Sequence, residues 1–203
     1  MPKTVDLTER NRVVSEAAWR VMVRDGLTAL SVRNVAAEAG LPPSSLRYTF
    51  PTQASVRDSA VALLVERMAE RVARHGASGE SDESNESNES DEDDTGTARA
   101  ILLELLPLDE ERRVEMEVSL ALGAMAATDR ALWQAHQRTH LAVREACVRA
   151  IELLGADRSD VDGTHALIDG LALHLVRQAP QTGDAWALRS LDAHLHRLLT
   201  PAA

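Results

Sequence analysis

The sequence predicts an all-α protein with a helix-turn-helix near its N-terminus. Apolar residues recur every three or four positions along most of the chain, which is the period of an amphipathic helix. No segment alternates apolar and polar residues as a half-buried strand does. Residues 31–50 divide at Gly40 into two short helical stretches, and the second carries several polar side chains. In a helix-turn-helix the second helix enters the DNA major groove.

Length and composition limit the class of protein further. A chain of 203 residues forms one domain or two small ones. It has no apolar run of about 18 residues and no N-terminal apolar stretch, so we expect neither a membrane span nor a signal peptide. We therefore expect a cytoplasmic protein. Cys147 is the only cysteine, which excludes an intrachain disulfide.

The net charge of −10 is unevenly distributed along the chain. Residues 1–75 carry 11 basic and 8 acidic side chains, and residues 99–203 carry 11 and 15. Residues 76–98 carry no basic and 9 acidic side chains. The end with the helix-turn-helix is thus mildly basic, and this local charge matters more for DNA binding than the total.

The N-terminal part is expected to form helices over residues 8–24, 32–39, 43–50 and 51–74. Ser31 is the expected N-cap of the second helix, because its hydroxyl can accept from a free backbone N–H. Gly40 can adopt a positive φ and turn the chain. Leu46 and Phe50 are expected to face inward and to anchor the third helix.

The C-terminal part is expected to be helical over residues 98–106, 109–127, 129–154, 160–179 and 184–199. Residues 76–98 contain no large apolar side chain, and the tripeptide Ser-Asn-Glu occurs twice in them. Such a segment cannot bury enough surface to offset its ordering entropy, so we predict a disordered acidic insertion. It is either a solvated loop or an acidic tail that competes with DNA. The predicted domains are residues 1–52, which bind DNA, and residues 53–203, which bind ligand and dimerise.

Three stretches resemble the TetR family of one-component transcriptional regulators. GLTALSVRNVAAEAGL (26–41) and SSLRYTF (44–50) resemble its helix-turn-helix, in the subgroup with Leu-Arg-aromatic-x-Phe. LPLDEERRVE, which begins at Leu106, resembles the C-terminal domain of betaine-pathway-type repressors. The resemblance implies a homodimer, in most cases a repressor. It also implies that a small molecule in the second domain shifts the angle between the DNA-binding heads.

The residues expected to contact DNA lie mainly on the second helix of the motif. Arg47 can bond a guanine edge or a phosphate, and Tyr48 can contact a thymine methyl group or a phosphate. Pro42, Thr49 and Gln53 replace a Ser or Thr, a His and a Lys that are common in the family, which weakens contacts to the DNA backbone. For each candidate the alternative is a solvated surface residue. The candidates are Ser31, Arg33, Pro43, Ser44, Ser45, Arg47, Tyr48, Thr49 and Gln53.

A ligand pocket is expected between the middle helices. Its candidate lining residues are Met116, Leu120, Met125, Trp133, His136, Leu167 and His174, and the alternative is ordinary hydrophobic core. Phe and Tyr occur once each, so an aromatic cage would have to rely on tryptophans. This scarcity argues against a choline-like ligand.

The last two helices are the expected dimer surface. Leucines recur there at three- and four-residue spacing, and the resemblance also places dimerisation on these helices. The alternative is that they all belong to the core of one chain. The leucines are Leu167, Leu171, Leu175, Leu188, Leu191, Leu195 and Leu198.

Metal binding and catalysis receive little support. His136 and His140 have the i, i+4 spacing of zinc ligands, but no Glu or Cys completes a recognisable frame. We therefore predict no metal, no cofactor and no enzyme activity. The sequence favours a ligand-responsive regulator that binds a near-palindromic double-stranded operator as a homodimer. The alternative is a helical module that binds a small molecule or a protein, without operator-specific DNA binding.

Overall fold

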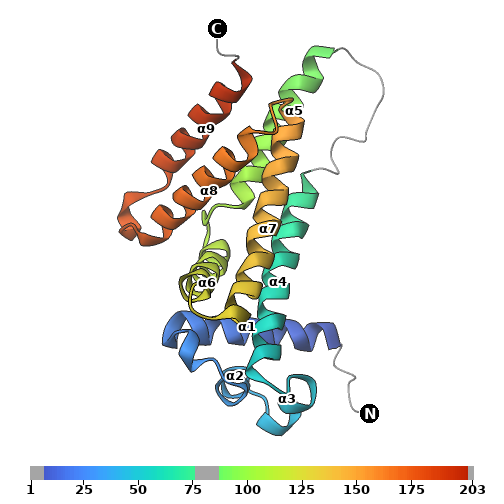
Figure 1. Ribbon diagram of the computed structural model, residues 1–203, viewed down its shortest axis with the longest axis vertical. Helices are drawn as coiled ribbons and strands as arrows, with labels where there is room; N and C mark the ends of the chain where they lie inside the picture. Colours follow the sequence, from blue (N-terminus) through green and yellow to red (C-terminus); the bar gives the residue numbers. More distant parts are fainter. Residues whose placement is uncertain (1–6, 76–86, 201–203) are drawn as a thin grey trace. The chain divides into compact units, whose positions relative to one another are not determined.

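The computed structural model describes residues 7–75 and 87–200, and all regular elements in these residues are helical (Figure 1). The prediction of an all-α fold is confirmed. Short 3-10 turns cover Leu27–Ala29 and Pro180–Thr182. The helices are α1 (Leu7–Asp25), α2 (Val32–Glu38), α3 (Pro43–Thr49), α4 (Gln53–Arg74), α5 (Ser87–Glu104), α6 (Glu110–Ala126), α7 (Arg130–Leu153), α8 (Asp160–Arg177) and α9 (Ala185–Leu199). None of these described helices is both long and apolar enough to cross a membrane.

The helices form two units. The N-terminal unit comprises the chain up to Arg67 together with Glu117–Thr139. The C-terminal unit comprises Met68–Met116 and the chain from His140 onward. Helices α4, α6 and α7 each contribute residues to both units. The predicted boundary at residue 52 was drawn by expected function, whereas these two units are defined by packing. The predicted boundary therefore stays a prediction.

In the N-terminal unit, α1 supplies the central apolar stripe. Val14, Ala17 and Ala18 on this helix are fully buried, as are the α2 residues Val35 and Ala36. The small side chains at the centre let α1 and α2 approach closely. Trp19 ties α1 to α4, since its buried indole Nε1 donates to the carbonyl of Ala60 at 3.1 Å. Figure 1 shows α1, α2 and α3 gathered around the beginning of α4.

The turn between α2 and α3 forms as the sequence predicted. Ser31 caps α2, because its Oγ accepts from the backbone N–H of Asn34 at 3.1 Å. At the other end, Gly40 has a φ of 65°, in the left-handed region. Its N–H bonds the carbonyl of Ala37, and the N–H of Leu41 bonds that of Ala36. This pair of bonds is a Schellman motif, which ends the helix and satisfies its last carbonyls.

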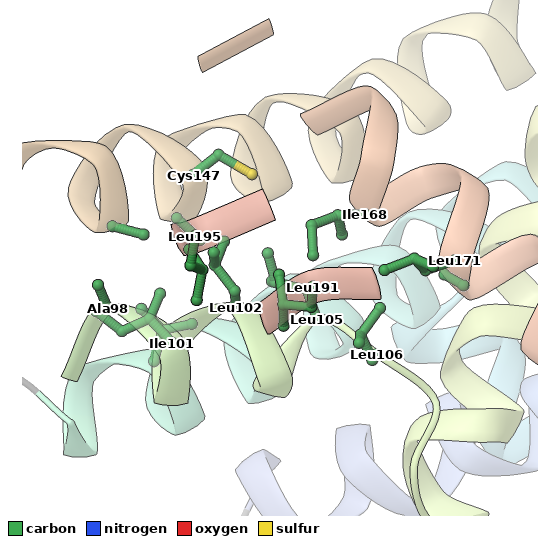
Figure 2. Packing of buried hydrophobic residues seen from close by; sticks show 14 of the residues in the cluster. Ala98, Ile101, Leu102, Leu105, Leu106, Cys147, Ile168, Leu171, Leu191 and Leu195 are labelled. Atoms are coloured by element: carbon green, nitrogen blue, oxygen red, sulfur yellow. The ribbon is translucent and has the colours of Figure 1, made fainter. Parts of the chain in front are cut away.

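The C-terminal unit has its own hydrophobic core, to which α5, α7, α8 and α9 contribute. Ile101 and Leu102 of α5, Ile168 of α8 and Leu191 of α9 are at most 1% exposed. Figure 2 shows these side chains converging, with Cys147 of α7 at the same core. Burial of such large aliphatic groups is the main stabilising term in this unit.

The LPLDEERRVE stretch fixes the start of α6 within the C-terminal unit. Asp109 caps the helix, since its Oδ1 accepts from the N–H of Arg112 at 2.8 Å. Arg113 donates to the last carbonyls of α8, at 2.7 Å to Val176 and 3.3 Å to Leu175. Glu115 is 5% exposed and pairs with Arg71 of α4 at 2.7 Å. A buried carboxylate requires such a partner, so this stretch determines how α4, α6 and α8 meet.

Helix α5 begins earlier than expected. The composition assigned residues 76–98 to a disordered insertion, but residues 87–98 form the first turns of α5. Residues 76–86 lie outside the described residues. Ala98 and Ile101 anchor this helix in the hydrophobic core, which composition alone could not show.

Gly40→Ala tests the turn of the helix-turn-helix. A Cβ at this position meets no atom within 4 Å, so any cost comes from the positive φ. We expect a loss of about 1–2 kcal/mol in the free energy of unfolding, measured by urea denaturation. Gly96→Ala is the control, because Gly96 lies in α5 in open space without a positive φ and the change should stabilise slightly. Equal stability changes for both variants would contradict this account of the turn.

Candidate DNA-binding surface

Helix α3 is held by one face and exposes the other. Leu46 is fully buried and Phe50 is 5% exposed, so both anchor the helix from beneath as expected. Pro43 occupies the first turn, where its missing N–H costs little. Arg47 is exposed, and the Tyr48 side chain is 94% exposed. A nearly fully exposed aromatic residue beside a guanidinium is a surface suited to contact a partner.

Ser45 has a partner that the sequence did not reveal. Arg10 of α1 donates from Nη2 to the carbonyl oxygen of Ser45 at 3.0 Å, and also to its Oγ. The two residues are 35 positions apart, and no local pattern links them. This contact fastens α3 to α1. The Ser45 hydroxyl is thereby engaged within the chain, whereas Ser44 beside it is exposed.

The other predicted DNA contacts border α3. Ser31 is half-buried and uses its hydroxyl as the N-cap of α2, and Arg33 on that helix is exposed. Thr49 is half-buried at the end of α3. Gln53 is exposed at the start of α4. Of the nine candidates, six lie on α3, two lie at the start of α2 and one lies at the start of α4, and all nine remain predictions.

Most arginines around α1 and α2 are paired with carboxylates. Arg20 and Arg24 each lie 2.8 Å from Glu38. Their hydrogen bonds, of which that of Arg24 has the larger effect, hold the pKa of the Glu38 carboxyl below its usual value. Arg12 pairs with Glu9 at 2.6 Å and with Glu16 at 2.7 Å. The exposed Arg33 and Arg47 form no ion pair with the described residues. Among the described residues of α1, α2 and α3, these two are the exposed arginines that have no carboxylate partner.

The predicted ligand residues are divided between the two units, and they stay predictions. Leu120, Met125, Trp133 and His136 belong to the N-terminal unit, whereas Met116, Leu167 and His174 belong to the C-terminal unit. Trp133 is 51% exposed. His174 is exposed too, and its ring lies edge-on to Trp186 with centroids 6.3 Å apart. The apolar pattern identified helix faces, but it could not show which faces surround a cavity.

A cavity of about 300 Å³ lies in the C-terminal unit, between the end of α4 and the middle of α7. None of the predicted ligand residues lines it. Its walls are small or flexible apolar residues with one acid and one base. The signal in the sequence was two pairs of alanines at i, i+4 spacing, one pair on α4 and one on α7. The lining residues are Met68, Ala69, Val72, Ala73, Ala142, Glu145, Ala146 and Arg149.

The leucines expected at a dimer surface divide into two sets. Leu171, Leu175, Leu191 and Leu195 are at most 5% exposed and belong to the core of their own chain. Leu167, Leu188 and Leu198 are half-buried. The alternative of intrachain core therefore describes the first set, and only the second set stays available to a partner.

The single cysteine is part of the same core. Cys147 is fully buried. Burial, followed by the charge of Asp169, raises the pKa of its thiol to about 12. It is therefore a neutral thiol at pH 7, and a buried thiol of this kind packs like a small apolar residue.

The fold and the exposed α3 define a helix-turn-helix transcriptional regulator, and comparison with known proteins gives the family. Residues 95–200 match the C-terminal domain of BetI-type transcriptional repressors. The HTH-type transcriptional regulator PksA of Bacillus subtilis (strain 168) is 33% identical over 180 residues, which cover 86% of this chain and 82% of that protein. The chain belongs to the TetR family of transcriptional regulators, of the BetI type. Its relatives are regulators rather than enzymes, as the sequence predicted.

Two solved structures share the fold. A transcriptional regulator from Rhodococcus sp. Rha1 superposes with a TM-score of 0.70 at 23% identity, covering 93% of this chain and 95% of that one. A regulator from Saccharomonospora viridis in complex with choline gives a TM-score of 0.66 at 19% identity, covering 93% and 96%. Both likenesses extend over nearly the whole chain.

Proposed function

We propose that this protein is a cytoplasmic repressor that binds a near-palindromic operator as a homodimer and releases it when a small molecule binds. The observation that carries the DNA-binding part is the exposed face of α3. Tyr48 is 94% exposed there, on a seven-residue helix whose other face is anchored by Leu46. Membership of the regulator family supports the same interpretation.

Helix α3 presents two kinds of contact. The guanidinium of Arg47 can donate two hydrogen bonds to a guanine edge or clamp a phosphate. The Tyr48 ring can contact a thymine methyl group while its hydroxyl reaches a phosphate. Arg33 on α2 is exposed and adds a second positive charge. Two such heads about 34–36 Å apart would read successive major grooves.

The small number of unpaired arginines gives a quantitative expectation. A protein that neutralises Z phosphates shows a slope of about −0.9Z when log K is plotted against log salt. If Arg33 and Arg47 act in both chains of a dimer, Z is about 4 and the slope is roughly −4. This is a shallow dependence for an operator-binding protein.

Arg47→Ala tests the assignment of α3. The operator is first selected from random duplex DNA with purified wild-type protein, and affinities are then measured by fluorescence anisotropy at several salt concentrations. If Arg47 reads a guanine, the variant should bind the operator about 5- to 150-fold more weakly and lose preference at one position per half-site. If it clamps a phosphate, affinity should fall uniformly and the salt slope should become shallower by about 1 per head.

Arg189→Ala is the matched control, since Arg189 is exposed on α9 in the C-terminal unit. It should leave both affinity and slope unchanged. A variant Arg47→Ala with wild-type affinity would contradict the role of α3. If selection enriches no sequence at low salt, the alternative of a helical binding module without operator specificity takes the place of this proposal.

The proposed dimer surface includes the exposed side of α8. Leu167, Leu188 and Leu198 are half-buried candidates on α8 and α9. Gly163, Ala166 and Gly170 of α8 follow one another at three- and four-residue spacing and are exposed or half-buried. Small residues at this spacing allow a partner helix to approach closely, and dimers are typical of the family.

Gly170→Arg should convert the dimer to a monomer without destabilising the fold of the single chain. A Cβ at Gly170 meets no atom within 4 Å, so one chain has room for the side chain, but a close partner helix would clash with it. Sedimentation velocity at micromolar concentration measures the outcome. Gly96→Arg, in open space on α5, is the control and should stay dimeric. If the Gly170→Arg variant is still a dimer, the dimer interface does not include this side of α8.

The cavity between α4 and α7 is the proposed ligand site. Its volume of about 300 Å³ is at the lower end of ligand sites. Alanine, valine and methionine side chains form most of the wall, and Glu145 and Arg149 supply the polar groups. Helix α4 starts beside the helix-turn-helix and ends in this wall, so one helix joins both sites. A ligand releases DNA if it binds more tightly to a state with low DNA affinity.

Ala142→Leu should close the cavity to small apolar molecules. The probes are hexanol, hexanoate, hexylamine and choline, and thermal shift measures their binding. At least one hexyl compound should raise the Tm of the wild type but not that of the variant. Choline should have no effect, because no aromatic ring lines the cavity to receive its cation.

Ala62→Leu is the control and should respond like the wild type, because Ala62 is an exposed residue of α4 outside both the cavity and the proposed dimer surface. If the hexyl compounds stabilise Ala142→Leu as much as the wild type, the ligand site lies elsewhere.

A further inference from the structure

Helices α7 and α8 bring two histidines and an aspartate together in the C-terminal unit. One ligand atom from each of His140, His165 and Asp169 lies within 4.8 Å of the other two. The rings of His140 and His165 have centroids 4.5 Å apart and planes inclined by 36°. Nε2 of His165 is 3.5 Å from Oδ2 of Asp169, one helical turn further along α8.

The buried histidine has an unused nitrogen. His165 is 6% exposed, and its Nε2 is buried without a hydrogen-bond partner. The 3.5 Å approach of Asp169 does not have the geometry of a hydrogen bond. Buried polar atoms without partners are rare in native proteins, and a metal ion bound to such a nitrogen would satisfy it.

We propose that His140, His165 and Asp169 bind a divalent transition-metal ion, of which Zn²⁺ is the best match. Two imidazole nitrogens and one carboxylate oxygen are the donor set of a three-residue zinc site with a fourth position open to water. Bonds of about 2.0–2.1 Å in a tetrahedron place ligand atoms about 3.3 Å apart. The pair of His165 and Asp169 already has nearly this spacing, and small side-chain rotations would bring in His140.

The surroundings of the cluster are compatible with a cation. Arg144, one turn beyond His140 on α7, pairs with Asp162 of α8 at 3.1 Å. Cys147 lies further along α7 as a buried thiol, outside the group of three. Asp169 is exposed, so the ion would have a route from solvent. Imidazole donors favour Zn²⁺ over hard cations such as Ca²⁺ and Mg²⁺.

Zinc titration of the full chain tests the proposal. Protein treated with a chelator and dialysed is titrated with ZnCl₂ in a calorimeter, and Co²⁺ serves as an optical probe of tetrahedral coordination. We expect one Zn²⁺ per chain. Asp169→Asn and His140→Gln should each weaken binding at least about tenfold, because each removes a ligand while conserving shape. His174→Gln is the control and should bind Zn²⁺ like the wild type, because His174 lies on α8, as Asp169 does, but is exposed and outside the cluster.

Circular dichroism of each variant verifies that its helices are intact. Absence of zinc binding by the folded wild-type protein would overturn the proposal. So would binding that persists unchanged in both Asp169→Asn and His140→Gln, since the metal would then sit elsewhere.

Discussion

A helix of seven residues does not persist in water by itself, and α3 is such a helix. Its existence depends on tertiary contacts to its inner face, where Leu46 and Phe50 are buried. The Schellman turn at Gly40 sets its direction relative to α2, and Arg10 fastens its backbone to α1 at Ser45. These contacts leave Arg47 and Tyr48 outside. The proposed DNA-binding face is therefore positioned by contacts on the opposite side of the helix and by its link to α1.

The C-terminal unit uses a different kind of constraint. Arg71 of α4 lies among carboxylates, 2.7 Å from Glu115 and 3.4 Å from Glu104. Arg112 also approaches Glu104, at 3.3 Å. A buried ion pair contributes little net stability, but breaking it leaves an uncompensated charge. The network therefore selects one arrangement of α4, α5 and α6, while the leucine core supplies most of the stability.

The sequence predicted what depends on local pattern. The helix periods, the Ser31 cap, the turn at Gly40 and the inward faces of Leu46 and Phe50 all follow from neighbouring residues. The start of α5 was missed because composition does not show that a distant core can extend a helix into an acidic segment.

Contacts between remote residues were missed as well: Arg10 with Ser45, and His140 with His165. The spacing of His136 and His140 suggested a pair, yet the partner of His140 lies on another helix. The leucines of α8 and α9 have one periodicity, and it could not separate those buried in their own chain from those left for a partner.

The ion pairs of Arg20 and Arg24 with Glu38 have a consequence for how the protein finds its site. Non-specific attraction to DNA comes almost entirely from unpaired positive charge. Three of the six arginines on α1, α2 and α3 are paired with carboxylates, so we expect the protein to spend less time on random genomic sequence. We also expect the search to proceed by repeated dissociation more than by long sliding. Selectivity for the operator increases in this way because binding to non-specific DNA becomes weaker, without any added contact to the operator itself.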